Sequence, residues 1–124
     1  MNVILLGSES PLSKRVIQEV SELSNVKVRI QEPSDWDQER MEAEPRPDVI
    51  LVDIDQSQGF GLDIIRRLRG RPGAWGPVIM AISSSPSLQY RASCHEAGAA
   101  FFFNRLREHD WLLDSLVAIQ EELR

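Results

Sequence analysis

The sequence predicts an α/β protein in which a five-stranded parallel sheet is covered by helices on both faces. Short apolar runs alternate along the chain with amphipathic stretches, which is the order of elements typical of this class. The central runs are apolar throughout, as expected for strands buried on both sides. The connections between them are short, which favours parallel strands joined through helices. The 124 residues match the usual length of one domain, so we expect residues 1–124 to form a single unit.

The first part of the chain holds three predicted elements. Met1–Leu6 is predicted to be a strand because it ends in four consecutive apolar residues. Leu12–Leu23 is predicted to be a helix because its apolar residues recur at spacings of three and four. Ser10 is placed to cap this helix, and Pro11 fits its first turn. Val26–Ile30 alternates apolar and basic residues, which indicates a half-exposed strand at a sheet edge.

The middle of the chain is less regular. The segment Gln31–Pro47 is polar and holds three prolines, and a short helix over Ser34–Ala43 is predicted there. Val49–Asp53 is a continuous apolar run that ends in an acid, which predicts a buried central strand. Gly61–Leu68 is predicted to be the next helix.

The last part repeats the alternation. Val78–Ile82 is a second buried strand, and Leu88–Ala97 is a helix that ends before Gly98. Ala100–Phe103 is predicted to be a short strand, and Asp110 is expected to cap the final helix.

Composition narrows the class of function. The net charge is −5, so nucleic acid is repelled on average and we expect no direct binding to it. No apolar run approaches the roughly 18 residues that a membrane span needs, and no secretory signal precedes the first strand. The single cysteine, Cys94, excludes an internal disulfide and a cysteine-based metal site. We therefore expect a cytoplasmic protein without a membrane partner.

Ligands of parallel α/β sheets bind beyond the carboxyl ends of the strands. We therefore searched the predicted strand ends for chemistry-bearing side chains. The polar residues found there are Ser8, Glu9, Asp53, Asp55, Ser83, Ser84, Asn104 and Arg105.

Two motifs connect these positions to a known family. In Pro47–Asp53 a Pro-Asp pair leads an apolar run into an aspartate, and Gly61 follows that aspartate by eight residues. In Ala97–Ala99 a glycine precedes the last strand, and Arg105 lies seven residues after it. From about Val3 to Glu122 the chain resembles the receiver domain of bacterial two-component response regulators, as an atypical and degenerate member. The resemblance implies one receiver-like domain with a three-layer, flavodoxin-like (βα)5 fold and strand order 2-1-3-4-5.

The resemblance also implies a chemistry. In receivers an aspartate attacks the phosphorus of a phosphohistidine on a partner kinase. Two acids after the first strand hold a magnesium ion, helped by the acceptor and by a carbonyl two residues beyond it. A hydroxyl after the fourth strand and a lysine after the fifth hold the phosphoryl oxygens.

Carried over residue by residue, this pattern assigns the acceptor to Asp53 and the carbonyl position to Asp55. The hydroxyl position falls on Ile82 or Ser83, depending on the anchor used, and we favour Ser83 because the polar run begins there. Arg105 stands at the lysine position, where it could bind phosphate or form a standing salt bridge with Asp53.

Other positions depart from the pattern. The acid pair aligns with Gly7 and Ser8, or its second member aligns with Glu9 when counted from the next helix. Leu106 replaces the usual proline, whereas Phe102 keeps the aromatic at the switch position. With this loss of carboxylates we expect Mg²⁺ to bind weakly or not at all. The candidate ligands are Glu9, Asp53 and Asp55.

Two hypotheses of function follow. In the first, the chain is a receiver in a phosphorelay, not an enzyme, and Asp53 accepts a phosphoryl group weakly if at all from a sensor histidine kinase. In the second, it is a phosphorylation-independent pseudo-receiver that binds another signalling protein or forms a homodimer. The expected surface is the fourth helix, fifth strand and fifth helix, around Tyr90, Phe102 and Trp111. A small-ligand binder using the strand-end cleft is a third and weaker alternative.

Overall fold

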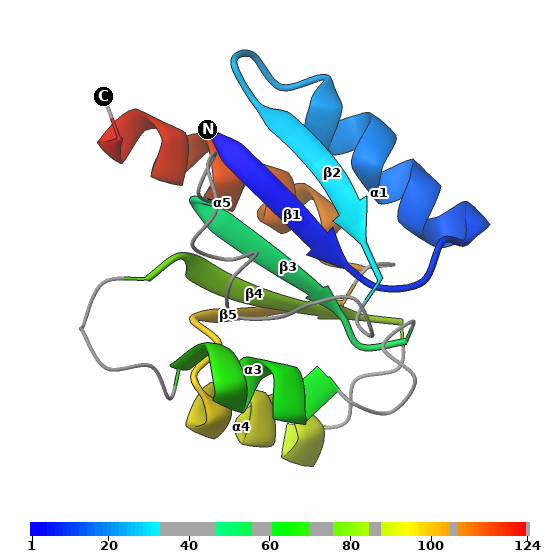
Figure 1. Cartoon of the computed structure of the whole chain (residues 1–124), viewed down its shortest axis with the longest axis vertical. Helices are drawn as coiled ribbons and strands as arrows, with labels where there is room; N and C mark the ends of the chain where they lie inside the picture. The colour runs from blue at the N-terminus through cyan, green and yellow to red at the C-terminus, as the bar shows by residue number, and fades with distance from the viewer. Residues whose placement is uncertain (33–46, 56–60, 70–75, 85–87, 105–106, 124) are drawn as a thin grey trace.

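A computed structural model describes residues 1–32, 47–55, 61–69, 76–84, 88–104 and 107–123. Five parallel strands form one sheet in the order β2-β1-β3-β4-β5, as predicted (Figure 1). β2 lies at one edge and is half-exposed, which its alternating sequence predicted. The strands are β1 (Asn2–Leu6), β2 (Lys27–Gln31), β3 (Val49–Asp53), β4 (Val78–Ser83) and β5 (Phe101–Asn104).

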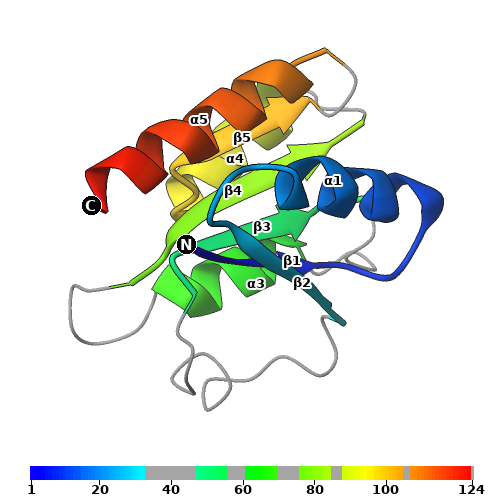
Figure 2. The same cartoon turned by 90° about the horizontal axis from the view of Figure 1, so that it is seen from above.

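The helices cover the two faces of the sheet (Figure 2). α3 and α4 pack on one face, and α1 and α5 pack on the other. The short helix predicted over 34–43 lies outside the described residues. The helices in the described part of the chain are α1 (Pro11–Ser21), α3 (Gly61–Arg69), α4 (Leu88–Ala97) and α5 (His109–Glu122). None of these helices has the length and apolar character required to cross a lipid bilayer.

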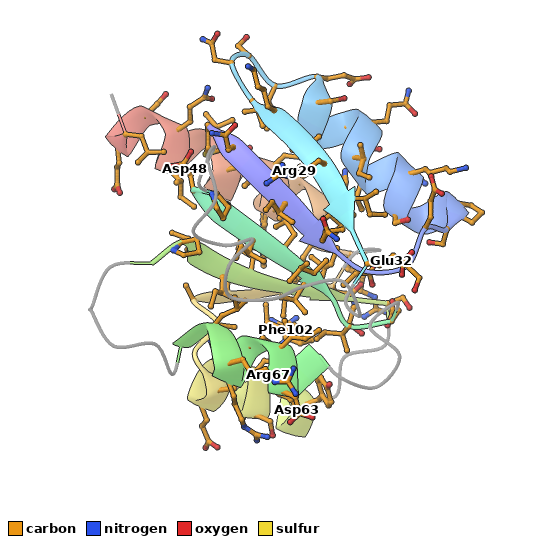
Figure 3. The ribbon with its side chains drawn as sticks, in the orientation of Figure 1. Arg29, Glu32, Asp48, Asp63, Arg67 and Phe102 are labelled. Atoms are coloured by element: carbon orange, nitrogen blue, oxygen red, sulfur yellow. The ribbon has the colours of Figure 1, made fainter. Side chains whose placement is uncertain are left out.

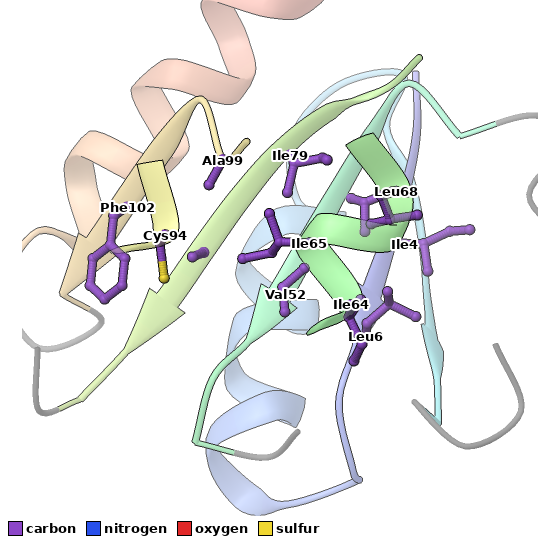
Figure 4. Close-up of a cluster of buried hydrophobic side chains, with 12 residues drawn as sticks. Ile4, Leu6, Val52, Ile64, Ile65, Leu68, Ile79, Cys94, Ala99 and Phe102 are labelled. Carbon is purple, nitrogen blue, oxygen red and sulfur yellow. The ribbon is translucent and has the colours of Figure 1, made fainter. Parts of the chain in front are cut away.

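Alternation along the strands divides the core into two clusters. Successive side chains of a strand point to opposite faces, so Ile4 and Leu6 face α3 and α4, whereas Val3 and Leu5 face α1 and α5. Figure 4 shows the first of these clusters, in which Cys94 from α4 packs with the aliphatic side chains. Because both faces are covered, β3 is buried along its whole length.

The parallel register brings the carboxyl ends of the strands to one edge. Asp53 at the end of β3 is paired with Ile82 of β4, and Ser83 is paired with Asn104 at the end of β5. At the other end of the strands, where β1 and β3 begin, the Asp48 Oδ2 accepts a hydrogen bond of 2.8 Å from the Asn2 amide. That contact aligns the start of β3 with the start of β1.

The predicted cap of α1 is confirmed, whereas the helix ends at Ser21, two residues before the predicted Leu23. Ser10 Oγ accepts from the Ser13 amide at 3.1 Å, and Ser13 Oγ accepts in return from the Ser10 amide at 2.7 Å. This reciprocal pair is a capping box in which serine takes the position that glutamate usually holds. Pro11 occupies the first turn, as predicted.

The predicted end of α4 is also confirmed, whereas the predicted cap of α5 was wrong. Gly98 adopts a φ of 124°, and the Ala99 amide bonds back to the Cys94 carbonyl, closing α4. α5 begins at His109 with Glu108 as its cap residue, so Asp110 lies inside the first turn. The earlier start follows from the Leu112 amide, which donates to the Glu108 carbonyl at 3.1 Å and makes Glu108 the cap residue of the helix.

The two-sided core makes a direct stability prediction. Leu5 is fully buried in the central part of the sheet, so Leu5→Ala should lower the free energy of unfolding by about 2–5 kcal/mol. Leu123 is 56% exposed, and Leu123→Ala should change the free energy of unfolding by less than about 0.5 kcal/mol. Urea denaturation of both variants checks this, and equal losses would contradict the described core.

Candidate functional site

Asp53 is the centre of the polar edge of the sheet. It is the last residue of β3 and is 0% exposed. Its Oδ1 accepts a hydrogen bond of 3.1 Å from the Asp55 amide, two residues later. Burying a carboxylate is costly unless hydrogen bonds or opposite charges compensate, so this turn is part of what holds the side chain there. The acid stands where the parallel-sheet rule predicted it.

Asp55 extends from the same turn to the neighbouring strand. Its Oδ1 accepts from the Ser83 hydroxyl at 3.0 Å, and its Oδ2 accepts from the Ser84 amide at 2.8 Å. The Ile54 amide donates to the Ile82 carbonyl at 2.9 Å, which continues the ladder one step beyond β3. The loop after β3 is therefore tied to the end of β4 through a carboxylate that accepts two hydrogen bonds.

The end of β4 distinguishes the two positions considered for the hydroxyl. Ile82 is fully buried in the cluster under α1 and α5, whereas Ser83 is the last residue of the strand and is nearly buried. Ser83, and not Ile82, thus lies at the polar edge beside the Asp53 and Asp55 turn. The sequence predicted this residue but not its hydrogen bond to Asp55.

A carboxylate that follows β2 lies beside the end of β1, and the sequence prediction missed it. Ser8 Oγ donates to Glu32 Oε2 at 3.2 Å, and Glu32 follows β2 at the same edge of the sheet (Figure 3). Glu9 instead is 64% exposed in its side chain and lies 4.0 Å from the Lys14 ammonium on α1. The strand-end rule would have found Glu32 if it had been applied to the edge strand as well.

The described residues do not assemble a metal cage. No group of three His, Cys, Asp or Glu side chains in the described segments could hold a metal ion. The proposed ligands also have other partners, because both oxygens of Asp55 accept protein hydrogen bonds and Glu9 faces Lys14. Magnesium prefers an octahedral shell of oxygen ligands supplied partly by carboxylates, and this arrangement does not fit it well.

Two residues of the predicted site lie outside the described part of the chain. These are Arg105, at the lysine position, and Leu106, at the proline position. The standing salt bridge between Arg105 and Asp53 therefore remains a prediction. The structure brings together Asp53, Asp55 and Ser83 from the predicted set.

Phe102, at the switch position, is enclosed by α4. Its ring is 4% exposed and meets the Tyr90 ring edge-on, with centroids 6.5 Å apart. The Arg91 guanidinium lies 5.1 Å from the centre of the Phe102 ring, in the range of a cation–π contact. Two side chains of α4 thus contact Phe102, the residue that the resemblance places at the switch position.

Arg91 also links α4 to the turn after β5. It forms an ion pair and hydrogen bond with the Glu108 carboxylate, and Glu108 Oε1 accepts from the Asn104 amide at 2.9 Å. The hydrogen bond from Arg91 holds the pKa of Glu108 below its ordinary value, and the Asn104 amide adds to this effect although burial opposes it. β5 and α5 are therefore joined to α4 by one charged contact.

The residues exposed on the predicted interaction surface differ in part from those expected. Phe102 is buried and contributes almost no exposed area, and Tyr90 is partly buried against the core. The exposed large apolar side chains of β5 and the start of α5 are instead Phe101 and Trp111, of which Trp111 is 63% exposed. The Phe101 ring stacks on Phe103 with centroids 5.8 Å apart.

Solved structures similar to this chain include response regulators. A response regulator receiver protein from Pseudoalteromonas atlantica aligns over 100% of both chains, with a TM-score of 0.83 at 12% sequence identity. This chain has the receiver fold. An atypical orphan response regulator, described as having a phosphorylation-independent regulatory mechanism, aligns over 96% of this chain and 94% of its own, with a TM-score of 0.74 at 17% identity.

A third receiver-fold neighbour is a response regulator in its Mn²⁺-bound form. It covers 95% of this chain and 91% of its own, with a TM-score of 0.66 at 19% identity. No family model matches the sequence, and no curated protein matches it either. The receiver fold is thus established by structure.

The Glu108 contact predicts a pH dependence. The folded pKa of Glu108 lies below the ordinary glutamate value of 4.5, so its contribution to stability is present above that pH and is lost as the pH falls through the lower folded value. The contribution at neutral pH should be about 0.5–1 kcal/mol, since the pair is partly solvated.

Glu108→Gln keeps an acceptor for the Asn104 amide and removes the charge. Urea denaturation should show the variant less stable than the native chain at neutral pH, with the difference shrinking under acid. A difference that stays constant with pH would contradict the role of the charge.

Proposed function

We propose that this chain is a signalling receiver that works mainly through protein–protein contact, with Asp53 as an acceptor that takes a phosphoryl group weakly if at all. The observation that carries the proposal is the buried Asp53 at the end of the central strand, in a receiver fold whose acid-pair and lysine positions have changed. Its partner is a sensor histidine kinase or another signalling protein.

The acceptor chemistry is available in outline. A carboxylate oxygen of Asp53 would form a bond to phosphorus while the bond from phosphorus to a histidine nitrogen breaks, and that nitrogen would keep its electron pair. Charge accumulates on the phosphoryl oxygens during transfer, and cations or fixed donors must compensate it. Gly7 and Ser8 stand where the resemblance places an acid pair, and Glu32, the carboxylate beside them, accepts a hydrogen bond from Ser8. This arrangement supports slow transfer.

The alternative of a phosphorylation-independent module has support of its own. One receiver-fold neighbour is an atypical orphan regulator described as phosphorylation-independent. The exposed Phe101 and Trp111 would present an apolar surface to a partner, supported from beneath by the buried Phe102, which Tyr90 and Arg91 contact. A homodimer through α4, β5 and α5 belongs to this alternative.

Labelling with acetyl phosphate tests the acceptor function. With magnesium present, intact-mass measurement should show the addition of one phosphoryl group in only a small fraction of the chain, because the cation is poorly held. Asp53→Asn should remove any addition that occurs. Rapid and complete labelling of the native chain would overturn the weak-acceptor proposal, and labelling that survives Asp53→Asn would overturn Asp53 as the acceptor.

A further inference from the structure

The Asp55 side chain occupies hydrogen-bond donors beside the acceptor. Its two carboxylate oxygens accept from the Ser83 hydroxyl at 3.0 Å and the Ser84 amide at 2.8 Å. Its own amide donates to Asp53 Oδ1 at 3.1 Å. One residue therefore contacts the Asp53 carboxylate with its backbone and the end of β4 with its side chain.

These donors lie within reach of a group attached to Asp53. Asp53 is the register partner of Ile82, and neighbouring strands are about 4.8 Å apart. Ser83 and Ser84 follow Ile82 directly at the end of β4. An oxyanion carried by Asp53 at this edge would place its oxygens toward the same O–H and N–H groups.

The chemistry of Asp55 matches that of an oxyanion. A carboxylate presents two anionic oxygens that accept hydrogen bonds, as a phosphoryl group presents three. A hydrogen bond to an ionised acceptor is roughly twice as strong as one between neutral groups. Since Asp55 belongs to the same chain, it competes for these donors without the entropy cost of binding from solution.

We propose that the Asp55 carboxylate is an internal anion that occupies the donors of Ser83 and Ser84 and thereby keeps a phosphoryl group from being held on Asp53. This inference rests on the proposed function, in which Asp53 is the acceptor. It gives a second reason for slow phosphoryl transfer to Asp53, separate from the weak binding of a cation. Asp55 also adds negative charge beside the reacting carboxylate, which opposes the approach of an anionic donor.

The internal anion has a second consequence for the fold. It ties the loop after β3 to the end of β4 and to Ser84 beyond it. Ser83 is in register with Asn104, whose amide is bound by Glu108 and through it connected to Arg91. The ends of β3, β4 and β5 are thus held in one arrangement by carboxylates of the chain itself.

Acetyl phosphate labelling of the full chain, with magnesium present, tests the inference. Asp55→Ala removes the competing carboxylate and should raise the initial rate of phosphoryl addition at Asp53 by about tenfold, the size expected when hydrogen bonds to a charged group no longer compete. In this addition an Asp53 oxygen bonds to phosphorus, the phosphorus–oxygen bond of acetyl phosphate breaks, and acetate leaves. Asp53→Asn in the same background should abolish the gain.

Asp55→Asn separates charge from shape. It keeps one oxygen acceptor and removes the charge, so it should give a smaller gain than Asp55→Ala. Asp63→Asn, at an exposed acid of α3, makes the same charge change away from the site and should leave the rate unchanged. Amide hydrogen exchange at Ser84 should become faster in both Asp55 variants and remain unchanged in Asp63→Asn.

The outcomes for the two proposals are distinct. If Asp55→Ala labels no faster than the native chain, or if the exchange of Ser84 does not change, the internal anion is refuted whatever the native rate. If the native chain itself labels rapidly and completely, the weak-acceptor function fails, and the internal anion survives only when Asp55→Ala is faster still. A gain of equal size in Asp63→Asn would also refute it, because the effect would then be one of net charge.

Discussion

The polar edge of this molecule depends on one constraint, which is the burial of the Asp53 carboxylate at the end of a strand covered on both faces. A carboxylate in that position requires compensation from hydrogen bonds or charge. The backbone supplies part of it through the Asp55 amide. The tight turn that results directs the Asp55 side chain to the end of β4, where it binds Ser83 and Ser84. The turn from Asp53 to Asp55 and the contact of Asp55 with the end of β4 therefore depend on each other.

The sheet behind this edge is aligned by polar contacts at its other end. At the start of β3, the Asp48 side chain accepts a hydrogen bond from the Asn2 amide. Parallel pairing keeps β1, β3 and β4 in register from there to the polar edge. The two apolar clusters then fix the sheet between α3 and α4 on one side and α1 and α5 on the other. Precise placement of the Asp53 carboxylate follows from this rigid background, since close-packed interiors allow little adjustment.

The comparison with other receiver folds gives this arrangement its significance. At 12–19% identity the solved structures share the architecture, while the chemistry at the strand ends is set by individual side chains. Here Asp55, a carboxylate considered for a cation site, is instead bonded to Ser83 and Ser84 at the end of β4. Glu108 is likewise bonded within the protein, to Arg91 and to the Asn104 amide.

The sequence by itself determined the α/β class, the order of strands and helices, the cap at Ser10, the stop at Gly98 and the position of Asp53 at a strand end. These features depend on local periodicity, on residues suited to particular backbone angles and on the rule that parallel strands end at one edge. Only the tertiary structure decided that Asp55 binds Ser83 and Ser84, that Glu32 lies beside Ser8, and that Arg91 covers Phe102 and holds Glu108. Each of these contacts joins separate elements of the fold, and the direction of a side chain between them is set by packing and hydrogen bonding that no local pattern of residues records.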